Sequence, residues 1–251
     1  MAGEYWLSDE AWATIEPLLP KVYAGARRQD DRRIISGIIH VLRSGCRWQD
    51  CPAVYGPSTT VYNRFNRWSR RGRWRSLFEA LVKEQPKDTR SVDSTSIRTQ
   101  RSAAGGKEGA KAQAIGRSRG GRTTKIHAVA DSEGRLFRFS LTPGNVADIT
   151  AAYELITDLP DKGCLIGDMG YDARKLRQAL AFRGIASVIP TNPTHQTQWP
   201  INLETYKKRN LVERMFSRLK DFRRIATRYD KLARNFASAI ALAAVVIWWV
   251  D

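Results

Sequence analysis

The sequence predicts an α/β domain preceded by an all-α domain. Over residues 1–88, apolar side chains recur every three to four positions, which is the helical period. Over residues 89–251, short β-branched segments alternate with helical ones in the order β-β-β-α-β-α-β-α, which indicates a mixed sheet flanked by helices. The 251 residues and their 42% hydrophobic share are enough for one well-packed core and a small second domain.

Four helices are predicted in the first domain, residues 1–88. Ser8 is a suitable N-cap for the first, which Pro20 ends, and Asp30 or Asp31 caps the second, which Gly45 ends. The segment 46–56 contains proline and glycine and is predicted to be a loop. The third and fourth helices are predicted over Ser58–Arg71 and about Trp74–Lys83, and the polar segment 85–89 is predicted to be a linker.

The third helix has the composition of a DNA-recognition helix. Val61, Phe65 and Trp68 are expected to face the core, and the remaining face carries arginine and asparagine. These side chains match the edges of guanine and adenine and also hold phosphates. We therefore predict a helix-turn-helix-like module; the alternative is a solvated basic face on an ordinary helical bundle. Its candidate DNA-binding residues are Asn63, Arg64, Asn66, Arg67, Arg70 and Arg71.

The second domain, residues 89–251, is predicted to contain five strands. They lie at Ser91–Thr99, Lys125–Ala130, Arg135–Leu141, Cys164–Gly167 and Ala186–Pro190. Helices are predicted at Asp148–Asp158, at Asp172–Phe182 with Asp172 as its cap, along the stretch from Tyr206 to Phe222, and over the apolar run Phe236–Val250. The apolar run is interpreted as a buried core helix, with a C-terminal membrane tail as the alternative.

Positive charge is concentrated in particular segments. The formal net charge is +17, and residues 98–125 hold eight basic residues and one acidic residue. This pattern indicates a polyanionic partner, so Arg117, Arg119, Arg122 and Lys125 are further candidate DNA contacts. Residues 100–122 are rich in glycine, serine and basic residues, and a mobile basic loop is predicted there. Three scattered cysteines are typical of a reducing cytosol, so we expect a cytoplasmic, nucleoid-associated protein.

Two carboxylates interrupt or end predicted strands, where an unpaired charge is costly. They are Asp93, within the first strand, and Asp168, directly after the fourth. A third, Glu213, shares a helical stripe with Tyr206, Arg209 and Lys220; ion pairing on a surface helix is the simpler explanation of that stripe. The three acids can converge at one sheet edge and hold two Mg²⁺ ions, with Mn²⁺ as a substitute.

Other aspartates have simpler structural roles in this sequence. Asp131 falls in a predicted hairpin turn, and Asp148 and Asp172 suit helix N-caps. Asp172 is the rival of Asp168 as the second metal ligand, because it lies only four residues further along the chain. We favour Asp168 because it directly follows the strand.

Several motifs together resemble insertion-sequence transposases of the IS5 family. Tyr206, Arg209, Glu213 and Lys220 match the Tyr-x2-Arg-x3-Glu-x6-Lys signature of the broader group at every position. The resemblance extends over nearly the whole chain, through the segments 56–57, 60–65, 92–95, 114–121, 168–172 and 226–231.

The resemblance implies a ribonuclease-H-like catalytic domain with Asp93, Asp168 and Glu213 as its Asp-Asp-Glu triad. It implies Mg²⁺-dependent cleavage at terminal inverted repeats and joining of the 3′ ends to target DNA, with Tyr206, Arg209 and Lys220 gripping DNA near the cut. A homodimer or higher oligomer on double-stranded DNA is expected, and no membrane association. Two alternatives remain: a nuclease of the same fold that does not join ends, and a catalytically silent DNA-binding repressor.

Overall fold

Two compact units make up the chain, and they differ from the predicted domains. The computed structural model describes residues 3–20, 30–82, 88–104, 113–157 and 159–250. A helical unit comprises 1–84, 99–113 and 218–251, and a sheet unit comprises 85–98 and 114–217. The predicted division at residue 88 assigned the whole C-terminal part to the α/β domain. The structure instead places the last 34 residues, 218–251, in the helical unit.

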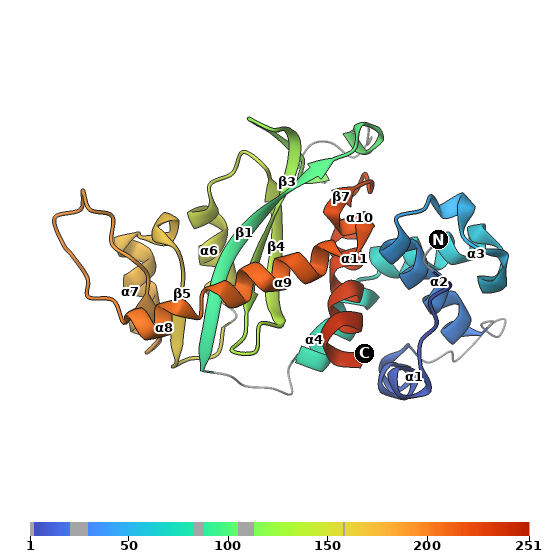
Figure 1. Cartoon of the computed structure of the whole chain (residues 1–251), viewed down its shortest axis with the longest axis horizontal. Helices are drawn as coiled ribbons and strands as arrows, with labels where there is room; N and C mark the ends of the chain where they lie inside the picture. Colours follow the sequence, from blue (N-terminus) through green and yellow to red (C-terminus); the bar gives the residue numbers. More distant parts are fainter. Residues whose placement is uncertain (1–2, 21–29, 83–87, 105–112, 158, 251) are drawn as a thin grey trace. The chain divides into compact units, whose positions relative to one another are not determined.

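The helical unit begins with the four predicted helices. They are α1 (Asp9–Ile15), α2 (Asp31–Ser44), α3 (Ser58–Arg70) and α4 (Arg73–Val82) (Figure 1). The predicted caps are confirmed: Ser8 accepts the Ala11 N–H at 3.1 Å and Asp30 accepts the Arg33 N–H at 3.0 Å. Gly45 ends α2 with φ of +79°, a conformation that glycine adopts without strain. The end of the fourth predicted helix and the linker residues 85–87 lie outside the described residues.

The C-terminal segment completes the helical unit. It contains α10 (Arg223–Ala226), the short strand β7 (Thr227–Arg228) and α11 (Ala233–Val245), which a π-helical turn extends through Val250. Helix α11 packs against α4, α3 and α2, and its residues from Ser238 to Val246 are buried. By length and composition Ala233–Val250 could also cross a membrane, but 61% of it is buried inside the protein. The expected core helix is therefore confirmed, in the helical unit rather than over the sheet.

The sheet unit contains a mixed sheet with β1 (Thr89–Thr99) near its centre. On one side β1 pairs antiparallel with β3 (Gly121–Ala130), which pairs antiparallel with β4 (Leu136–Pro143). On the other side β1 runs parallel to β5 (Cys164–Ile166), and β5 runs parallel to β6 (Ala186–Val188). All five predicted strands are present, and the predicted α/β class is confirmed.

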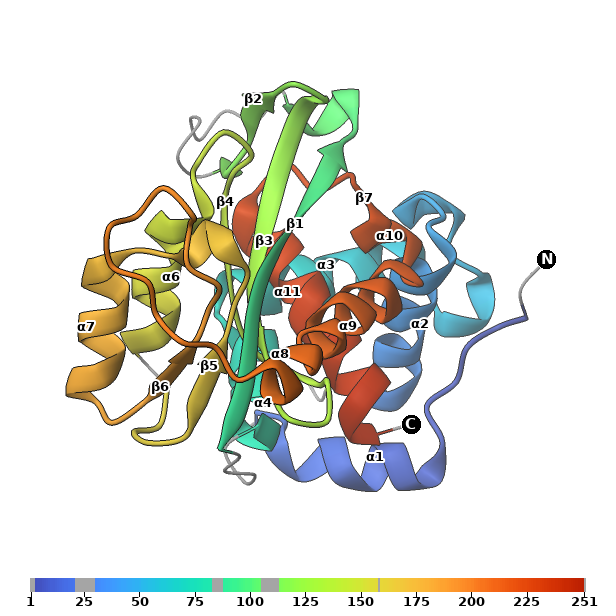
Figure 2. The same ribbon diagram turned by 60° about the vertical axis from the view of Figure 1, so that its left-hand side comes forward.

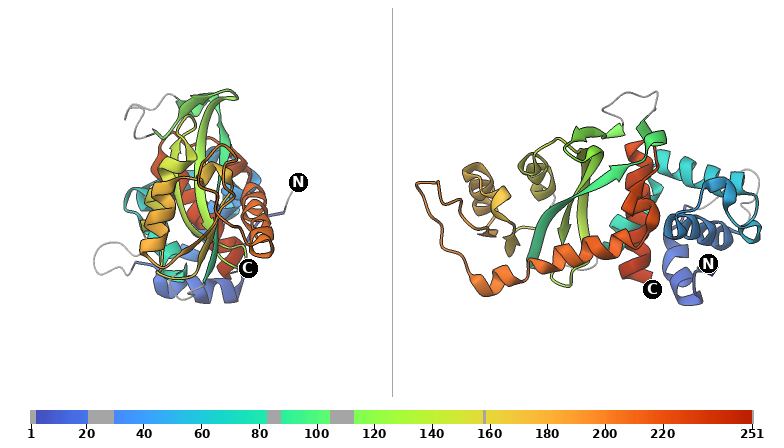
Figure 3. Two further views of the ribbon diagram at one scale, coloured as in Figure 1. Left: turned by 90° about the vertical axis from the view of Figure 1, so that its left-hand side faces the viewer. Right: turned by 45° about the horizontal axis from the view of Figure 1, so that its top comes forward.

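Helices cover both faces of this sheet. Helices α6 (Asp148–Thr157) and α7 (Arg174–Phe182) lie on one face, and the segment with α8 (Leu203–Lys207) and α9 (Asn210–Lys220) crosses the other (Figures 2 and 3). The single helix predicted from Tyr206 onward is wrong, because a turn at Lys208–Arg209 separates α8 from α9. The helix α7 begins after Ala173, so the predicted cap role of Asp172 is also wrong.

The predicted mobile loop 100–122 contains ordered structure at both ends. A short 3₁₀ turn covers Arg101–Ala104, and β2 (Gly116–Ser118) forms a hairpin with the start of β3. Backbone hydrogen bonds between β2 and β3 form this hairpin, and amino-acid composition does not predict them. The middle of the predicted loop, 105–112, lies outside the described residues.

Candidate active site

The register between β1 and β5 brings two carboxylates to one edge of the sheet. These parallel strands pair Ser91 with Ile166, so two residues further along, Asp93 and Asp168 lie side by side. Asp93 is mostly buried, with its side chain 18% exposed. Burial raises the pKa of Asp93 above its ordinary value, the Ser94 N–H and Arg209 lower it, and the charges of Asp168 and Glu213 raise it again. The other two predicted triad members are therefore close enough to Asp93 to influence its pKa.

Arg209 connects the strand acid to the helix acid. Its Nη1 lies 3.0 Å from Asp93 Oδ2, and its Nη2 lies 2.6 Å from Glu213 Oε1. Arg209 sits in the turn between α8 and α9, one helical turn before Glu213. The i,i+4 pairing that surface helices commonly show is present here, but the same guanidinium also reaches a strand 116 residues away in sequence. Because of this second contact, Arg209 and Glu213 are linked to Asp93 and are more than a local pair on the helix surface.

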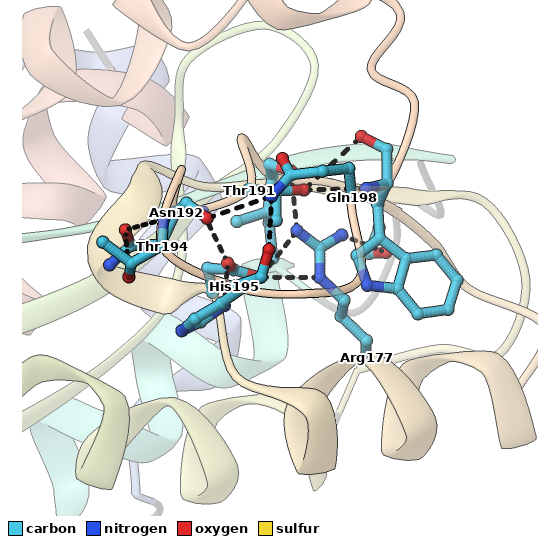
Figure 4. Close-up of polar contacts among 10 residues, drawn as sticks. Arg177, Thr191, Asn192, Thr194, His195 and Gln198 are labelled. Carbon is cyan, nitrogen blue, oxygen red and sulfur yellow. Dashed lines mark hydrogen bonds and ion pairs between the residues drawn. The ribbon is translucent and has the colours of Figure 1, made fainter.

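Asp168 and Asp172 have different surroundings. The Asp172 side chain is 3% exposed; it pairs with Arg177 and His195 at 2.8 Å each and accepts the Asn192 N–H at 2.8 Å. Figure 4 shows Arg177 and His195 among the polar contacts that tie the 191–198 loop to α7. Asp168 accepts the Gly170 N–H at 2.9 Å and remains half-exposed beside Asp93. The carboxylate of Asp172 therefore binds the 191–198 loop and Arg177. This favours Asp168 as the candidate metal ligand.

A polar cluster that the sequence did not predict lies beside the acid edge, as we call the sheet edge that carries Asp93 and Asp168. Asp148, at the start of α6, accepts from Ser94 Oγ at 2.8 Å and from Lys125 Nζ at 2.9 Å. His127 lies beneath it, fully buried, with Nε2 at 2.7 Å from Thr142 Oγ1. The cluster surrounds Ser94, the neighbour of Asp93 on β1. Ser94 and His127 are directly opposite each other on β1 and β3. The alternation of side chains along these two strands was the sequence signal that could have predicted the cluster.

The donor set at this edge fits a divalent metal ion. Carboxylate oxygens are the ligands that Mg²⁺ and Mn²⁺ prefer, and two of the three carboxylates, Asp93 and Glu213, already hold a positive charge, that of Arg209. Within the described parts of the chain, no three His, Cys, Asp or Glu side chains are drawn together tightly enough to hold one ion. In this structure, Arg209 pairs with Asp93 and Glu213, two of the acids that would hold the metal ion.

The predicted DNA-binding residues of α3 divide into exposed and buried ones. Asn63, Arg67, Arg70 and Arg71 are exposed, and Asn66 is half-buried. Arg64 is 4% exposed, makes an ion pair with Asp31 and lies over the Trp68 ring at 5.0 Å. Its predicted outward direction is wrong, because position 64 shares the buried helical stripe of Val61 and Trp68. Arg64 holds α3 to α2 and is not available to DNA.

The remaining predicted contacts lie on both units. Arg117, Arg119 and Arg122 are exposed on the β2–β3 hairpin, and Tyr206 is half-buried on α8. Lys220 is exposed at the end of α9, within the helical unit. The ammonium of Lys125 donates to Asp148 and to the Val146 carbonyl, each at 2.9 Å, so the structure gives it a role beneath the acid edge instead of a free surface position.

Two family models together cover almost all of the sequence. The model described as "Putative transposase of IS4/5 family" matches residues 7–78, and the model described as "Transposase DDE domain" matches residues 84–248. The chain belongs to the DDE transposase family. The first match narrows this to transposases of the insertion-sequence type, so the resemblance drawn from the sequence motifs is confirmed.

Similar proteins include two that are named for insertion sequences. A "Putative transposase for insertion sequence element IS6501" from Brucella ovis is 39% identical over 127 residues, which are 50% of this chain and 98% of the relative. A "Putative transposase for insertion sequence element IS402" from Burkholderia cepacia is 33% identical over 137 residues, 50% of this chain and 63% of the relative. The chain thus aligns with these relatives over half of its own length.

The fold of this DDE transposase is similar to that of a solved transposase. The piggyBac transposase in a synaptic complex with hairpin DNA is 10% identical, with a TM-score of 0.54, over 96% of this chain and 70% of that one. At this identity the likeness concerns the fold alone. With the strand order described above, it confirms the expected ribonuclease-H-like sheet in the DDE transposase.

Proposed function

We propose that this DDE transposase binds the terminal inverted repeats of its insertion sequence, cleaves DNA at the element ends and joins the 3′ ends to target DNA. The observation that supports this most directly is that Asp93 feels the charges of both Asp168 and Glu213, while Arg209 pairs with Asp93 and Glu213. A site with three acids, two of which share one cation, is suited to metal-assisted phosphoryl transfer. A repressor without catalytic activity would have no need to keep Asp93 buried near two further negative charges.

Asp93, Asp168 and Glu213 would hold the ions, two Mg²⁺ with Mn²⁺ as a substitute. When bound, these ions would activate the attacking oxygen and stabilise the leaving oxygen of an in-line displacement at phosphorus. The protein's own contribution is to fix the acids: β1 and β5 set the spacing of Asp93 and Asp168, and the Ser94 N–H bonds Asp93 Oδ1 at 2.7 Å. Released from the acids, Arg209 would bind a DNA phosphate, since its planar fork matches phosphate as well as carboxylate.

DNA would be held by cationic surfaces of both units. The exposed face of α3 carries Arg67, Arg70 and Arg71, and the β2–β3 hairpin carries Arg117, Arg119 and Arg122. Tyr206 and Lys220 of the signature would contact DNA near the cut. Joining two element ends in one reaction requires two active sites, so we propose a homodimer or higher oligomer on DNA, acting at the nucleoid in the cytoplasm.

The test uses a donor DNA that carries the inverted repeats found beside the gene. Purified protein with Mg²⁺ is expected to cut the ends and to join them to a target plasmid. Asp93→Asn is expected to bind the ends with unchanged affinity and to cut about 10³-fold more slowly, because it removes a group that acts on the reacting phosphate.

A matched control removes the same charge elsewhere. The Asp161 side chain is 69% exposed and pairs with Arg183, so Asp161→Asn should retain full activity. Cleavage without joined product would indicate a nuclease, and full cleavage by Asp93→Asn would refute the metal assignment.

A further inference from the structure

The helical unit contains a pocket of about 510 Å³. None of the three predicted triad acids lines it. Its walls come from the turn after α2, the middle of α3 and the segment that joins α10 to α11. This size is within the range of pockets that take small organic ligands, roughly 300–1,000 Å³. The lining residues are Trp48, Tyr62, Asn66, Arg224, Tyr229, Asp230, Lys231, Leu232, Arg234 and Asn235. Residues 229–231, the second half of the 226–231 motif that the acid edge does not use, form part of one wall.

Three aromatic rings give this pocket flat apolar surfaces. Trp48 and Tyr62 meet at a centroid distance of 5.5 Å, and Tyr62 and Tyr229 are 37% and 38% exposed. The Arg224 guanidinium lies over Trp48 at 5.3 Å and over Tyr229 at 5.2 Å, so it links the two rings. Aromatic rings and arginine planes presented in this way are the surfaces on which unstacked nucleic-acid bases stack.

Positive charge surrounds the aromatic surfaces. Lys231 and Arg234 are exposed at the rim, and Arg224 is buried in the wall, against the single acid Asp230. Behind the wall, the fully buried Arg228 donates to the carbonyls of Asp230 and Lys231 at 2.9 and 3.2 Å. These bonds fix the course of the chain from Asp230 to Lys231. The rim is therefore a preformed site for an anionic group such as a phosphate.

Buried polar atoms in the wall lack hydrogen-bond partners. Asn235 is 6% exposed; its Nδ2 donates to Asn66 Oδ1 at 3.1 Å, but within the described chain its Oδ1 has no hydrogen-bond partner. Nε of Arg224, which is 5% exposed, is also without one there. Buried groups of this kind are normally satisfied, so their presence beside a pocket points to a ligand with polar edges. Asparagine amides match the hydrogen-bonding edges of bases.

We propose that this pocket binds one unstacked nucleotide of DNA, with the base on the exposed rings of Tyr62 and Tyr229 and the phosphate on Lys231 and Arg234. The inference rests on the proposed function in taking DNA as the ligand. A base inside a duplex shows only its edge, so the rings can be used only by a nucleotide that has left the stack or belongs to a single strand. A site for phosphate alone would not need three aromatic surfaces.

The test measures stacking directly and does not depend on cutting. The full-length protein is titrated in EDTA with a single-stranded DNA of about 15 nucleotides that carries a central 2-aminopurine, whose fluorescence falls when it stacks. A second oligonucleotide has an abasic site at that position. Wild-type protein should quench the 2-aminopurine. Tyr229→Ala should bind the base-containing strand about 10-fold more weakly and the abasic strand with unchanged affinity, whereas Tyr229→Phe should behave as wild type.

Tyr153→Ala is the matched control, because Tyr153 is 37% exposed on α6 of the sheet unit, outside this pocket. It should leave both affinities unchanged. Lys231 is exposed, so Lys231→Ala should weaken the binding of both oligonucleotides to the same extent. It should also reduce the salt dependence of binding by about one counterion. An equal loss on both strands for Tyr229→Ala, or no quenching by wild-type protein, would overturn the proposal.

Failure of the pocket can be separated from failure of the proposed function. Duplex binding and Mg²⁺-dependent cutting of the element ends are measured on the same preparations. Absence of quenching with cutting intact refutes the pocket alone. Absence of cutting with the quenching and its loss in Tyr229→Ala intact refutes the catalytic assignment and leaves the nucleotide pocket standing.

Discussion

The acid edge of the sheet unit and the pocket of the helical unit are built around arginines in opposite electrostatic balance. At the edge, Arg209 bridges Asp93 and Glu213 while Asp168 adds a third negative charge. In the pocket, Asp230 is near the charges of both Arg224 and Arg228, and Lys231 and Arg234 add to them. The surplus charge of each region therefore agrees with the ligand proposed for it: a metal ion at the edge and a phosphate in the pocket.

Burial acts on the acids of both regions in the same direction. It raises the pKa of Asp93 and of Asp230 above the ordinary value of an aspartate, and neighbouring arginines lower both. Only Asp93 also faces other carboxylates, which raise its pKa further. The charge of the pocket acid is therefore opposed only by arginines, whereas Asp93 also faces two like charges, which agrees with the proposed metal site.

The largest expected effect separates the two aspartates that follow β5. Asp168→Asn should slow DNA cleavage about 10³-fold with little change in stability, because it removes a half-exposed carboxylate at the edge. Asp172→Asn should keep the cleavage step but lose about 3 kcal/mol of stability, because it leaves the buried Arg177 without its charged partner. Single-turnover cleavage at low temperature and urea unfolding measure the two effects. An inactive but fully stable Asp172→Asn protein would reverse our assignment.

The next effect is a pH dependence of stability beneath the acid edge. Burial lowers the pKa of His127 to about 4, with Asp148 opposing and Lys125 reinforcing the shift. Below pH 6.5 the unfolded chain binds a proton that the folded chain does not, so stability falls as the pH falls from 6.5 to 4. Relative to His127→Gln, the wild-type protein should lose about 3 kcal/mol between pH 8 and pH 4. If the free energy of unfolding depended on pH in the same way in the two proteins, this prediction would be contradicted.

A third comparison concerns two arginines of α3. Arg64→Ala should lose about 3 kcal/mol of stability, because it removes the Arg64 guanidinium from the largely buried Asp31 carboxylate. Arg67 is exposed on the same helix, so Arg67→Ala should keep its stability and lose only a few-fold in affinity for duplex DNA, with a salt dependence smaller by about one counterion. Thermal melts and salt titrations measure both. Equal stability of the two variants would show that Arg64 is not held as described.

Several local features were predictable from the sequence because their causes are local. Ser8, Asp30 and Gly45 act within one helical turn, and the structure has the helix ends where these residues predict them. The strands around Asp93 and Asp168 followed from β-branched and apolar runs. The burial of Arg64 is also local in origin, since its position relative to Val61 and Trp68 places it on the buried stripe. The prediction from its charge, that it faces outward, is wrong because helical period decides its direction.

The sequence by itself determined most of the helices and strands and the family, and it predicted the three acids, because side-chain period, capping and motif spacing are local to the chain. The tertiary structure decided which distant groups meet. The β1–β5 register put Asp168 beside Asp93, the 191–198 loop occupied Asp172, and the packing of α11 on α4 gave the C-terminal segment to the helical unit. The pocket between α3 and segment 224–235 also depends on contacts more than 150 residues apart, such as Asn66 with Asn235. Contacts of that span depend on how whole elements pack, and no local pattern records them.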